Sequence, residues 1–377
     1  GYVNDGSALA AKFIEEEMKS MGLEIVNQPA FNVPVNVFPN KMQLAINGKH
    51  LEPGKDFLID PSSARASLKS SNIRIISKKQ LTNEQAFVDL IPPLNNAVAA
   101  IDLRGVEEES ISKQLNFLRY SQVPLHRALL IFSDNKLTWG LSSVQLSRPV
   151  FTVKKTLSID AIESVSMKVD AKFHPDYPVK NVIGKITGKN SDSTIVFTAH
   201  YDHLGMMGSK TVFPGANDNA SGIAMMLNLA RYFSAIPVKY DLLFVAFGAE
   251  ELGLLGSQFF VKNPPMDLSK IKFLVNFDLA GTGGEGITVV NATKYPDPFH
   301  WLLSLNDSLQ LLPDIKKRGE ACNSDHCPFD RKKIPCFYIY TRGGIQAYHD
   351  IYDRYETLPL TEFEDYAMLM IEFVKSF

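Results

Sequence analysis

The fold is decided by residues 194–203, which read TIVFTAHYDH. The first six residues form a compact, mostly apolar run of strand length, and His200, Asp202 and His203 follow it directly. Such runs are typical of central strands that are buried on both faces of a sheet. Further runs of this kind occur at 241–247, 272–278, 287–290 and 335–340.

Segments with helical spacing of apolar residues fill the gaps between these runs. They cover 220–233, 252–262, 298–309 and 360–375, and a further one covers 8–21, where Gly22 reads as the helix stop. Alternation of strands and helices predicts an α/β fold, in which helices flank both faces of a mostly parallel central sheet.

The pattern changes between about residue 31 and residue 153. Short strand-like runs such as 42–46, 73–76 and 128–132 dominate there, with one amphipathic helix expected around 111–120. This region has few histidines and no convincing ligand cluster. We therefore predict two domains: 1–30 with 168–377 as the α/β domain, and 31–167 as a β-rich inserted domain.

Composition excludes several classes of function. The chain has 377 residues and a formal net charge of -2, so a large core fits and no basic stripe suggests a nucleic-acid partner. No apolar stretch approaches the roughly 20 residues of a membrane span. The chain opens without Met or a signal-peptide pattern, and we expect an exported protein, periplasmic or extracellular, whose signal segment is absent from this chain.

Three cysteines, Cys322, Cys327 and Cys336, lie close together near the C-terminus. A disulfide between the first two and free buried thiols are both compatible with this spacing. A zinc ribbon is not expected, because the two Cys-x-x-Cys pairs of such sites are missing.

Polar residues follow the apolar runs at the positions where α/β sheets bind ligands. They are AHYDH at 199–203, GAEE at 248–251 and NFD at 276–278, joined by the loops PGANDNASG at 214–222 and YHD at 348–350. Each piece alone has a structural explanation, such as an N-cap for the Asn-Asp-Asn loop. Histidines and carboxylates from five segments, if gathered in one cleft, point to a cation or to catalysis.

Three of these segments, in their full length, resemble the successive motifs of the M28 family of zinc aminopeptidases and carboxypeptidases. They read TAHYDHLG at 198–205, GANDNASG at 215–222 and AEELGLLGS at 249–257, and NFD at 276–278 and YH at 348–349 complete the set. The resemblance covers roughly residue 179 to the C-terminus plus the N-terminal helix. The insertion is similar to a protease-associated domain in its strand pattern and position.

The resemblance implies a site for two Zn²⁺ ions. It makes Asp218 the carboxylate shared by both ions. Glu251 and His349 then complete one zinc site, and His200 and Asp278 complete the other. Mixed His and carboxylate ligation suits a hydrolytic zinc pair that shares one carboxylate.

Further roles follow from the same resemblance. Glu250 is expected to act as the general base toward a metal-bridging water. Tyr348 is expected to polarise the scissile carbonyl, with a packed aromatic as the alternative. From its position alone, two residues after His200, Asp202 is well placed to orient that imidazole. Asp325 and His326 are expected to line the cleft in supporting roles.

The function implied is that of a zinc-dependent exopeptidase acting on peptides, with an aminopeptidase favoured over a carboxypeptidase. Two alternatives stay open: a single-zinc enzyme like glutaminyl cyclase, and a non-catalytic receptor-like member. The continuation EELGLLGS at 250–257 resembles the peptidases more than the cyclases. We further hypothesise that the insertion restricts access to the cleft, with a passive spacer as the alternative.

Overall fold

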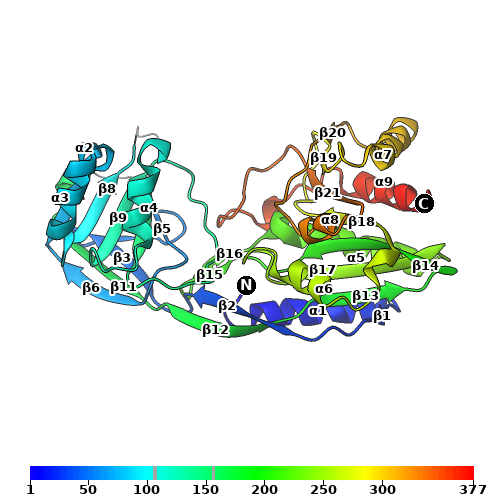
Figure 1. The fold of residues 1–377 in the computed structure, drawn as a ribbon, viewed down its shortest axis with the longest axis horizontal. Helices are drawn as coiled ribbons and strands as arrows, with labels where there is room; N and C mark the ends of the chain where they lie inside the picture. The colour runs from blue at the N-terminus through cyan, green and yellow to red at the C-terminus, as the bar shows by residue number, and fades with distance from the viewer. Residues whose placement is uncertain (105–107, 155–157) are drawn as a thin grey trace.

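The computed structural model describes residues 1–104, 108–154 and 158–377. Two lobes lie side by side and are joined by a long two-stranded ribbon (Figure 1). One lobe holds an eight-stranded sheet and the C-terminus, and the other holds the strands of the inserted region. We call them the central-sheet lobe and the inserted lobe.

The central sheet has the strand order β1-β13-β17-β14-β18-β21-β19-β20. In this order the strands are β1 (Glu24–Ile25), β13 (Val182–Ile186), β17 (Tyr240–Phe247), β14 (Asn190–His200), β18 (Ile271–Phe277), β21 (Cys336–Thr341), β19 (Ile287–Val290) and β20 (Ile315–Lys317). The four middle strands run parallel, which confirms the predicted sheet type. Every antiparallel pair among the described strands of this sheet includes one of the flanking strands β13 and β19.

Helices cover both faces of this sheet. One core cluster packs the first face against α1 (Gly6–Ser20), α5 (Gly222–Ser234), α7 (Pro296–Leu309) and α9 (Phe363–Lys375). A second cluster packs the other face against α6 (Leu255–Lys262) and α8 (Cys327–Arg331). Phe197 in β14 stacks against Phe233, Phe244 and Phe277, so aromatic packing fixes the strand that carries the first predicted ligand.

The inserted lobe contains two sheets. The larger has the order β5 (Phe57–Ile59), β10 (Val150–Lys154), β9 (Ala128–Ser133), β8 (Val98–Asp102) and β7 (Ile73–Ile76). The smaller has the order β4 (Lys49–Leu51), β3 (Met42–Ile46), β11 (Val165–Val169) and β6 (Ala66–Ser70). The similarity of this lobe to a protease-associated domain stays a prediction.

This lobe has more helix than its sequence pattern predicted. Besides α4 (Ser112–Tyr120), it contains α2 (Lys78–Thr82) and α3 (Glu84–Leu94). The side chain of Asn83 caps α3 by accepting the amide of Ala86 at 2.9 Å. Pro92 and Pro93 lie near the end of α3. A Pro pair usually signals a break, and α3 indeed ends at Leu94, directly after the pair.

The ribbon consists of β2 (Phe31–Val37) and β12 (Lys172–Val179), paired antiparallel from Phe31 opposite Val179 to Val37 opposite Lys172. The chain therefore enters and leaves the inserted lobe at one place. The predicted boundary after residue 30 coincides with the start of β2, and the one after residue 167 lies within β11. The division into two domains stays a prediction.

The lobes also share an apolar cluster. A hairpin of the central-sheet lobe, β15 (Gly205–Met207) and β16 (Thr211–Phe213), packs against Trp139 of the inserted lobe. The rings of Trp139 and Phe213 lie 4.7 Å apart. We call the buried residues that meet there the interlobe cluster: Phe38, Trp139, Leu204, Met207, Phe213 and Ile351.

The cysteines near the C-terminus adopt one of the two arrangements left open. Cys322 and Cys327 form a disulfide, and Cys336 is a buried free thiol. In the described part of the chain, no helix is long and apolar enough to cross a membrane.

Candidate metal centre

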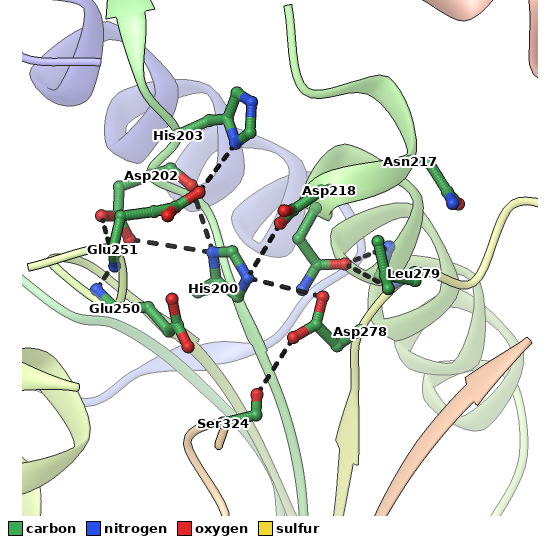
Figure 2. Close-up of polar contacts among 12 residues, drawn as sticks. His200, Asp202, His203, Asn217, Asp218, Glu250, Glu251, Asp278, Leu279 and Ser324 are labelled. Atoms are coloured by element: carbon green, nitrogen blue, oxygen red, sulfur yellow. Dashed lines mark hydrogen bonds and ion pairs between the residues drawn. The ribbon is translucent and has the colours of Figure 1, made fainter. Parts of the chain in front are cut away.

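Four of the five predicted ligands, His200, Asp218, Glu251 and Asp278, lie close together at the carboxyl-terminal edge of the parallel strands (Figure 2). His200 is the last residue of β14, the pair Glu250 and Glu251 follows β17, and Asp278 follows β18. Asp218 lies in an irregular helical turn, Ala216–Ser221, that leads into α5. His349 comes from the loop between β21 and α9.

Asp218 lies between two histidines. Its Oδ1 is 3.4 Å from Nε2 of His200, and its Oδ2 is 3.0 Å from Nε2 of His349. The Nε2 atom of His200 is also 3.6 Å from Asp278 Oδ1, and that of His349 is 3.3 Å from Glu251 Oε2. One carboxylate thus faces two neighbouring groups of ligand atoms, as a shared ligand of two ions must.

Backbone carbonyls fix the orientation of both imidazoles. Nδ1 of His200 donates to the carbonyl oxygen of Asp202 at 3.1 Å, and Nδ1 of His349 donates to that of Trp139 at 2.9 Å. A carbonyl can only accept, so Nδ1 carries a proton in each ring and Nε2 is the atom turned toward the carboxylates. Metal-binding histidines are held in this way.

The electrostatics of the site favour a cation. Burial alone would lower the pKa of His349, but the carboxylates of Asp218 and Glu251 raise it to about 10. Burial and neighbouring carboxylates raise the pKa of Asp218, although His349 and His200 oppose this. The concentrated negative charge therefore attracts a positive charge into the space between these side chains.

Two groups of potential ligand atoms result. His203, Asp218, Glu251 and His349 form one, and His200, Glu250 and Asp278 form the other, with the ligand atoms of each group within 4.8 Å of one another. The donor set, its burial and the fixed imidazoles fit a pair of metal ions. The roles assigned to single residues stay predictions.

Comparison with known proteins agrees with this geometry. The sequence profile of peptidase family M28 matches residues 181–374, more than half of the chain. The chain belongs to peptidase family M28.

Curated members resemble this M28 chain over part of their length. Aminopeptidase YwaD of Bacillus subtilis is 30% identical over 217 residues, which are 55% of this chain and 46% of that protein. Leupeptin-inactivating enzyme 1 of Streptomyces exfoliatus is 33% identical over 176 residues, 44% of this chain and 38% of that enzyme. The chain thus spans about half the length of these relatives or less.

Solved structures match the fold over nearly all of this M28 chain. The zinc aminopeptidase BSAP from Bacillus subtilis superposes with a TM-score of 0.70 and 20% identity, covering 98% of this chain and 88% of that one. The aminopeptidase of Aneurinibacillus sp. strain AM-1 gives a TM-score of 0.65 and 20% identity, with 98% and 87% covered. Both lobes therefore belong to an arrangement seen in other proteins.

Asp202 supports this M28 site differently from the sequence prediction. Its carboxylate oxygen is 3.9 Å from Nδ1 of His200, so the imidazole is oriented by the backbone oxygen instead. The carboxylate accepts the amides of Glu250 at 3.0 Å and Glu251 at 3.3 Å, and the hydroxyl of Tyr2 at 2.8 Å. Asp202 thus fixes the turn in which the side chains of the two glutamates point in different directions (Figure 2).

Two supports of the predicted ligands were missed by the sequence analysis. Asp353 is fully buried and accepts the amides of Asn217 at 2.8 Å and Asp218 at 3.0 Å. Ser324 donates to Asp278 Oδ2 at 3.1 Å (Figure 2). The available signal was weak, since Asp353 lies four residues after His349 in an ordinary loop sequence.

His203 lies at the centre, next to the predicted ligand Glu251. Its Nδ1 donates to Glu251 Oε1 at 2.8 Å, and the ring is buried. Burial would raise the pKa of Glu251, but hydrogen bonds from His203 and His349 lower it. His203 therefore keeps the Glu251 carboxylate ionised and oriented.

The remaining predicted residues surround the centre. Burial raises the pKa of Asp325 to about 7, although His200 and the side chain of Ser257 oppose this. His326 donates from Nε2 to the carbonyl of Ala321 at 2.7 Å and stacks on Tyr338. The supporting roles of Asp325 and His326 stay predictions.

The ring of Tyr348 stacks face to face on the imidazole of its neighbour His349. Its ring centroid lies 4.1 Å from that of His349 at an angle of 14°, and 44% of the residue is exposed. Partial burial and the nearby carboxylates raise the pKa of the phenol. The hydroxyl therefore stays protonated at neutral pH and can donate a hydrogen bond to a bound molecule.

Proposed function

We propose that this chain is a zinc-dependent exopeptidase, and more narrowly an aminopeptidase, that removes residues from peptides. The observation that carries the proposal is the placement of the Asp218 carboxylate between two oriented imidazoles, with the carboxylate of Glu250 beside them. The family and the names of the relatives, an aminopeptidase and a leupeptin-inactivating enzyme, support it.

The ligand assignment follows the two groups of atoms. Asp218 with His200 and Asp278 would hold one zinc ion, and Asp218 with Glu251 and His349 would hold the other. Two bound zinc ions would polarise the scissile carbonyl and make the attacking water more acidic.

Glu250 is assigned the proton transfers. A carboxylate oxygen of this residue lies within 4.8 Å of ligand atoms of His200 and Asp278. Burial raises the pKa of Glu250 well above its usual range, which suits a group that must hold a proton between two steps. It takes a proton from the attacking water and delivers it to the nitrogen of the leaving amine.

Tyr348 is assigned to the substrate carbonyl. Its exposed ring and protonated hydroxyl lie at the rim of the site, beside His349. The hydroxyl would donate a hydrogen bond to the carbonyl oxygen as negative charge develops there.

Zinc content together with a substrate panel tests the proposal. We expect about two zinc ions per chain, cleavage of aminoacyl anilides, and no cleavage of their N-acetylated counterparts. One zinc ion with cyclisation of N-terminal glutamine would establish a cyclase instead. A chain that binds no zinc and cleaves nothing would contradict the proposal as a whole.

We also propose that the protein is exported. The disulfide between Cys322 and Cys327 supports this, because disulfides persist mainly in oxidising compartments. Fractionation of cells that make the natural protein tests it: recovery in the cytoplasm only would contradict export.

A further inference from the structure

A loop of the inserted lobe reaches the metal centre. This loop connects β9 to β10, and its Trp139 exchanges two hydrogen bonds with the predicted ligand His349. The amide of Trp139 donates to the carbonyl of His349 at 2.9 Å, and its carbonyl accepts from Nδ1 of the imidazole at 2.9 Å. One residue of the inserted lobe thus fixes both the backbone and the ring of the ligand.

Lys136 in the same loop reinforces this contact. Its ammonium group donates to Asp350 Oδ2 at 2.7 Å, to the carbonyl of Gln346 at 2.7 Å and to that of Tyr348 at 3.2 Å. Asp350 is buried, and its other oxygen accepts the amide of Tyr352 at 2.8 Å. A single side chain therefore joins three points of the loop that carries His349.

The loop needs such support because its conformation is unfavourable by itself. His349 has a φ of 52°, in the left-handed region that residues with a Cβ rarely adopt. A residue keeps such a conformation when the surrounding structure holds it there. In this protein, several of the hydrogen bonds that hold His349 and its loop come from Trp139 and Lys136 of the inserted lobe.

The other half of the centre is built differently. The acceptor for Nδ1 of His200 is the carbonyl of Asp202, two residues along the same chain segment. Asp278 is held by Ser324, which also belongs to the central-sheet lobe. These supports of His200 and Asp278 thus come from their own lobe, whereas those of His349 come partly from the inserted lobe.

We propose that Lys136 is a positioning residue for His349, so that the inserted lobe completes the half of the metal centre formed by Glu251 and His349. The inference rests on the proposed function, which makes these residues zinc ligands. It gives the inserted lobe a role in metal binding that is separate from any control of access.

The test compares zinc affinities of Lys136→Met and the parent, measured on the full chain by competition with a chromophoric chelator. Methionine keeps the length and apolar character of the stem but donates no hydrogen bond. We expect one of the two zinc ions to bind about 10- to 100-fold more weakly, the usual effect of losing an outer support of a ligand. The second ion should bind within about twofold of the parent.

Three further variants serve as controls. Lys49→Met changes an exposed lysine on β4 of the same lobe and should bind both ions like the parent. Lys136→Arg keeps the charge and several donors and should recover most of the affinity. The double variant Lys136→Met/Asp350→Asn also removes the buried charge that the single variant leaves without its lysine. It should therefore fold even if the single variant does not, and the same selective loss is expected.

The outcomes separate the two proposals. A parent that binds fewer than two zinc ions contradicts the proposed function and this inference with it. A parent that binds two, with variants that lose both ions equally or neither, contradicts the inference alone. General destabilisation of the fold would weaken the binding of both ions together. A loss of affinity for one ion alone therefore identifies a positioning role.

Discussion

Each histidine of the predicted ligand set is fixed on the side that faces away from the carboxylates. Backbone carbonyls do this for His200 and His349, and they leave Nε2 as the only ring nitrogen turned toward Asp218. The carboxylates are fixed in turn by buried donors such as Ser324. Such preorganisation means that substitutions around the centre should change metal affinity and turnover separately.

Glu250→Gln should separate catalysis from metal binding. The amide has the shape of the carboxylate but cannot accept the proton, so we expect turnover to fall about 10²- to 10⁴-fold while zinc content and thermal stability stay near those of the parent. Steady-state kinetics with zinc analysis measures both quantities. The neighbouring Glu251→Gln provides the contrast, because it should lose zinc, and parental turnover of Glu250→Gln would remove the proton-transfer role.

Asp353→Asn should weaken the binding of both zinc ions together. The buried carboxylate accepts two backbone amides, at Asn217 and Asp218, and an asparagine oxygen cannot replace both acceptors. Since Asp218 faces both groups of ligand atoms, we expect both affinities to fall about 10-fold or more. Chelator competition gives the two constants. A loss confined to one ion, or none, would show that Asp353 does not support a shared ligand.

The sequence indicated site residues only where a potential ligand directly follows a strand-like run or lies in a family motif. His200, Asp278 and the Glu250–Glu251 pair directly follow strand-like apolar runs, so their convergence could be expected from the amino-acid pattern alone. Trp139 and Lys136 lie more than 200 residues before the loop that they hold. No local pattern reveals such partners, because they are brought together only by the packing of the two lobes.

At the level of elements, the strands were easier to predict than the helix boundaries. The α/β fold class is confirmed, and the described strands of the central sheet include all five runs expected from the sequence. The helix expected from residue 252 begins at Leu255, because Gly253 and Leu254 adopt φ values of 103° and 62°. This left-handed turn follows the Glu250–Glu251 pair, so the requirements of the site delay the helix.

His126, in the connection between α4 and β9, should make stability depend on pH. It is buried and donates from Nε2 to the carbonyl of Leu118 at 2.9 Å. Burial, with a smaller contribution from the charge of Arg148, lowers its pKa to about 4, although the hydrogen bond to Leu118 opposes the change. Its unfolded value is about 6.5, so the unfolded chain binds the proton first as the pH falls. The contribution of neutral His126 to the free energy of unfolding is therefore fully present above about pH 6.5 and is lost as the pH falls toward 4.

We expect protonation of this histidine to lower the free energy of unfolding by about 2 kcal/mol between pH 7 and pH 5. His126→Gln keeps an amide donor but does not titrate, so the variant should lose less stability over the same interval. Urea unfolding of zinc-free parent and variant at both pH values gives the difference. Equal losses in the two proteins would show that His126 is not the titrating group.

At the scale of the whole molecule, the interlobe cluster argues against an inserted lobe that moves freely. Leu204, Met207, Phe213 and Ile351 of the central-sheet lobe are buried in the same cluster as Trp139. Replacing the whole insertion by a linker would expose this apolar surface, so point variants are the better test of its function. The idea that the insertion restricts access stays a prediction.

The shared cluster predicts that both lobes unfold together. We expect one calorimetric transition for the parent and a loss of about 3 to 5 kcal/mol in Phe213→Ala, the usual cost of removing a buried Phe side chain. Phe117→Ala, at a position that is 45% exposed in the inserted lobe, is the matched control and should cost less. Two well-separated transitions in the parent would mean that the lobes are coupled only weakly.

Because the inserted lobe interrupts the central-sheet lobe in the sequence, it also determines the order in which the protein can fold during its synthesis. Glu24 in β1 pairs with Lys185 in β13, which is made 161 residues later, after the whole inserted lobe. At about 5 to 20 residues per second, the ribosome needs roughly 8 to 30 seconds to supply that partner. Ala11, Ile14 and Met18 on the buried face of α1 have to wait for the same strands. The emerging chain therefore presents an uncovered apolar helix throughout this interval, and crosslinking of stalled ribosomes should capture a chaperone on α1 until β13 has appeared.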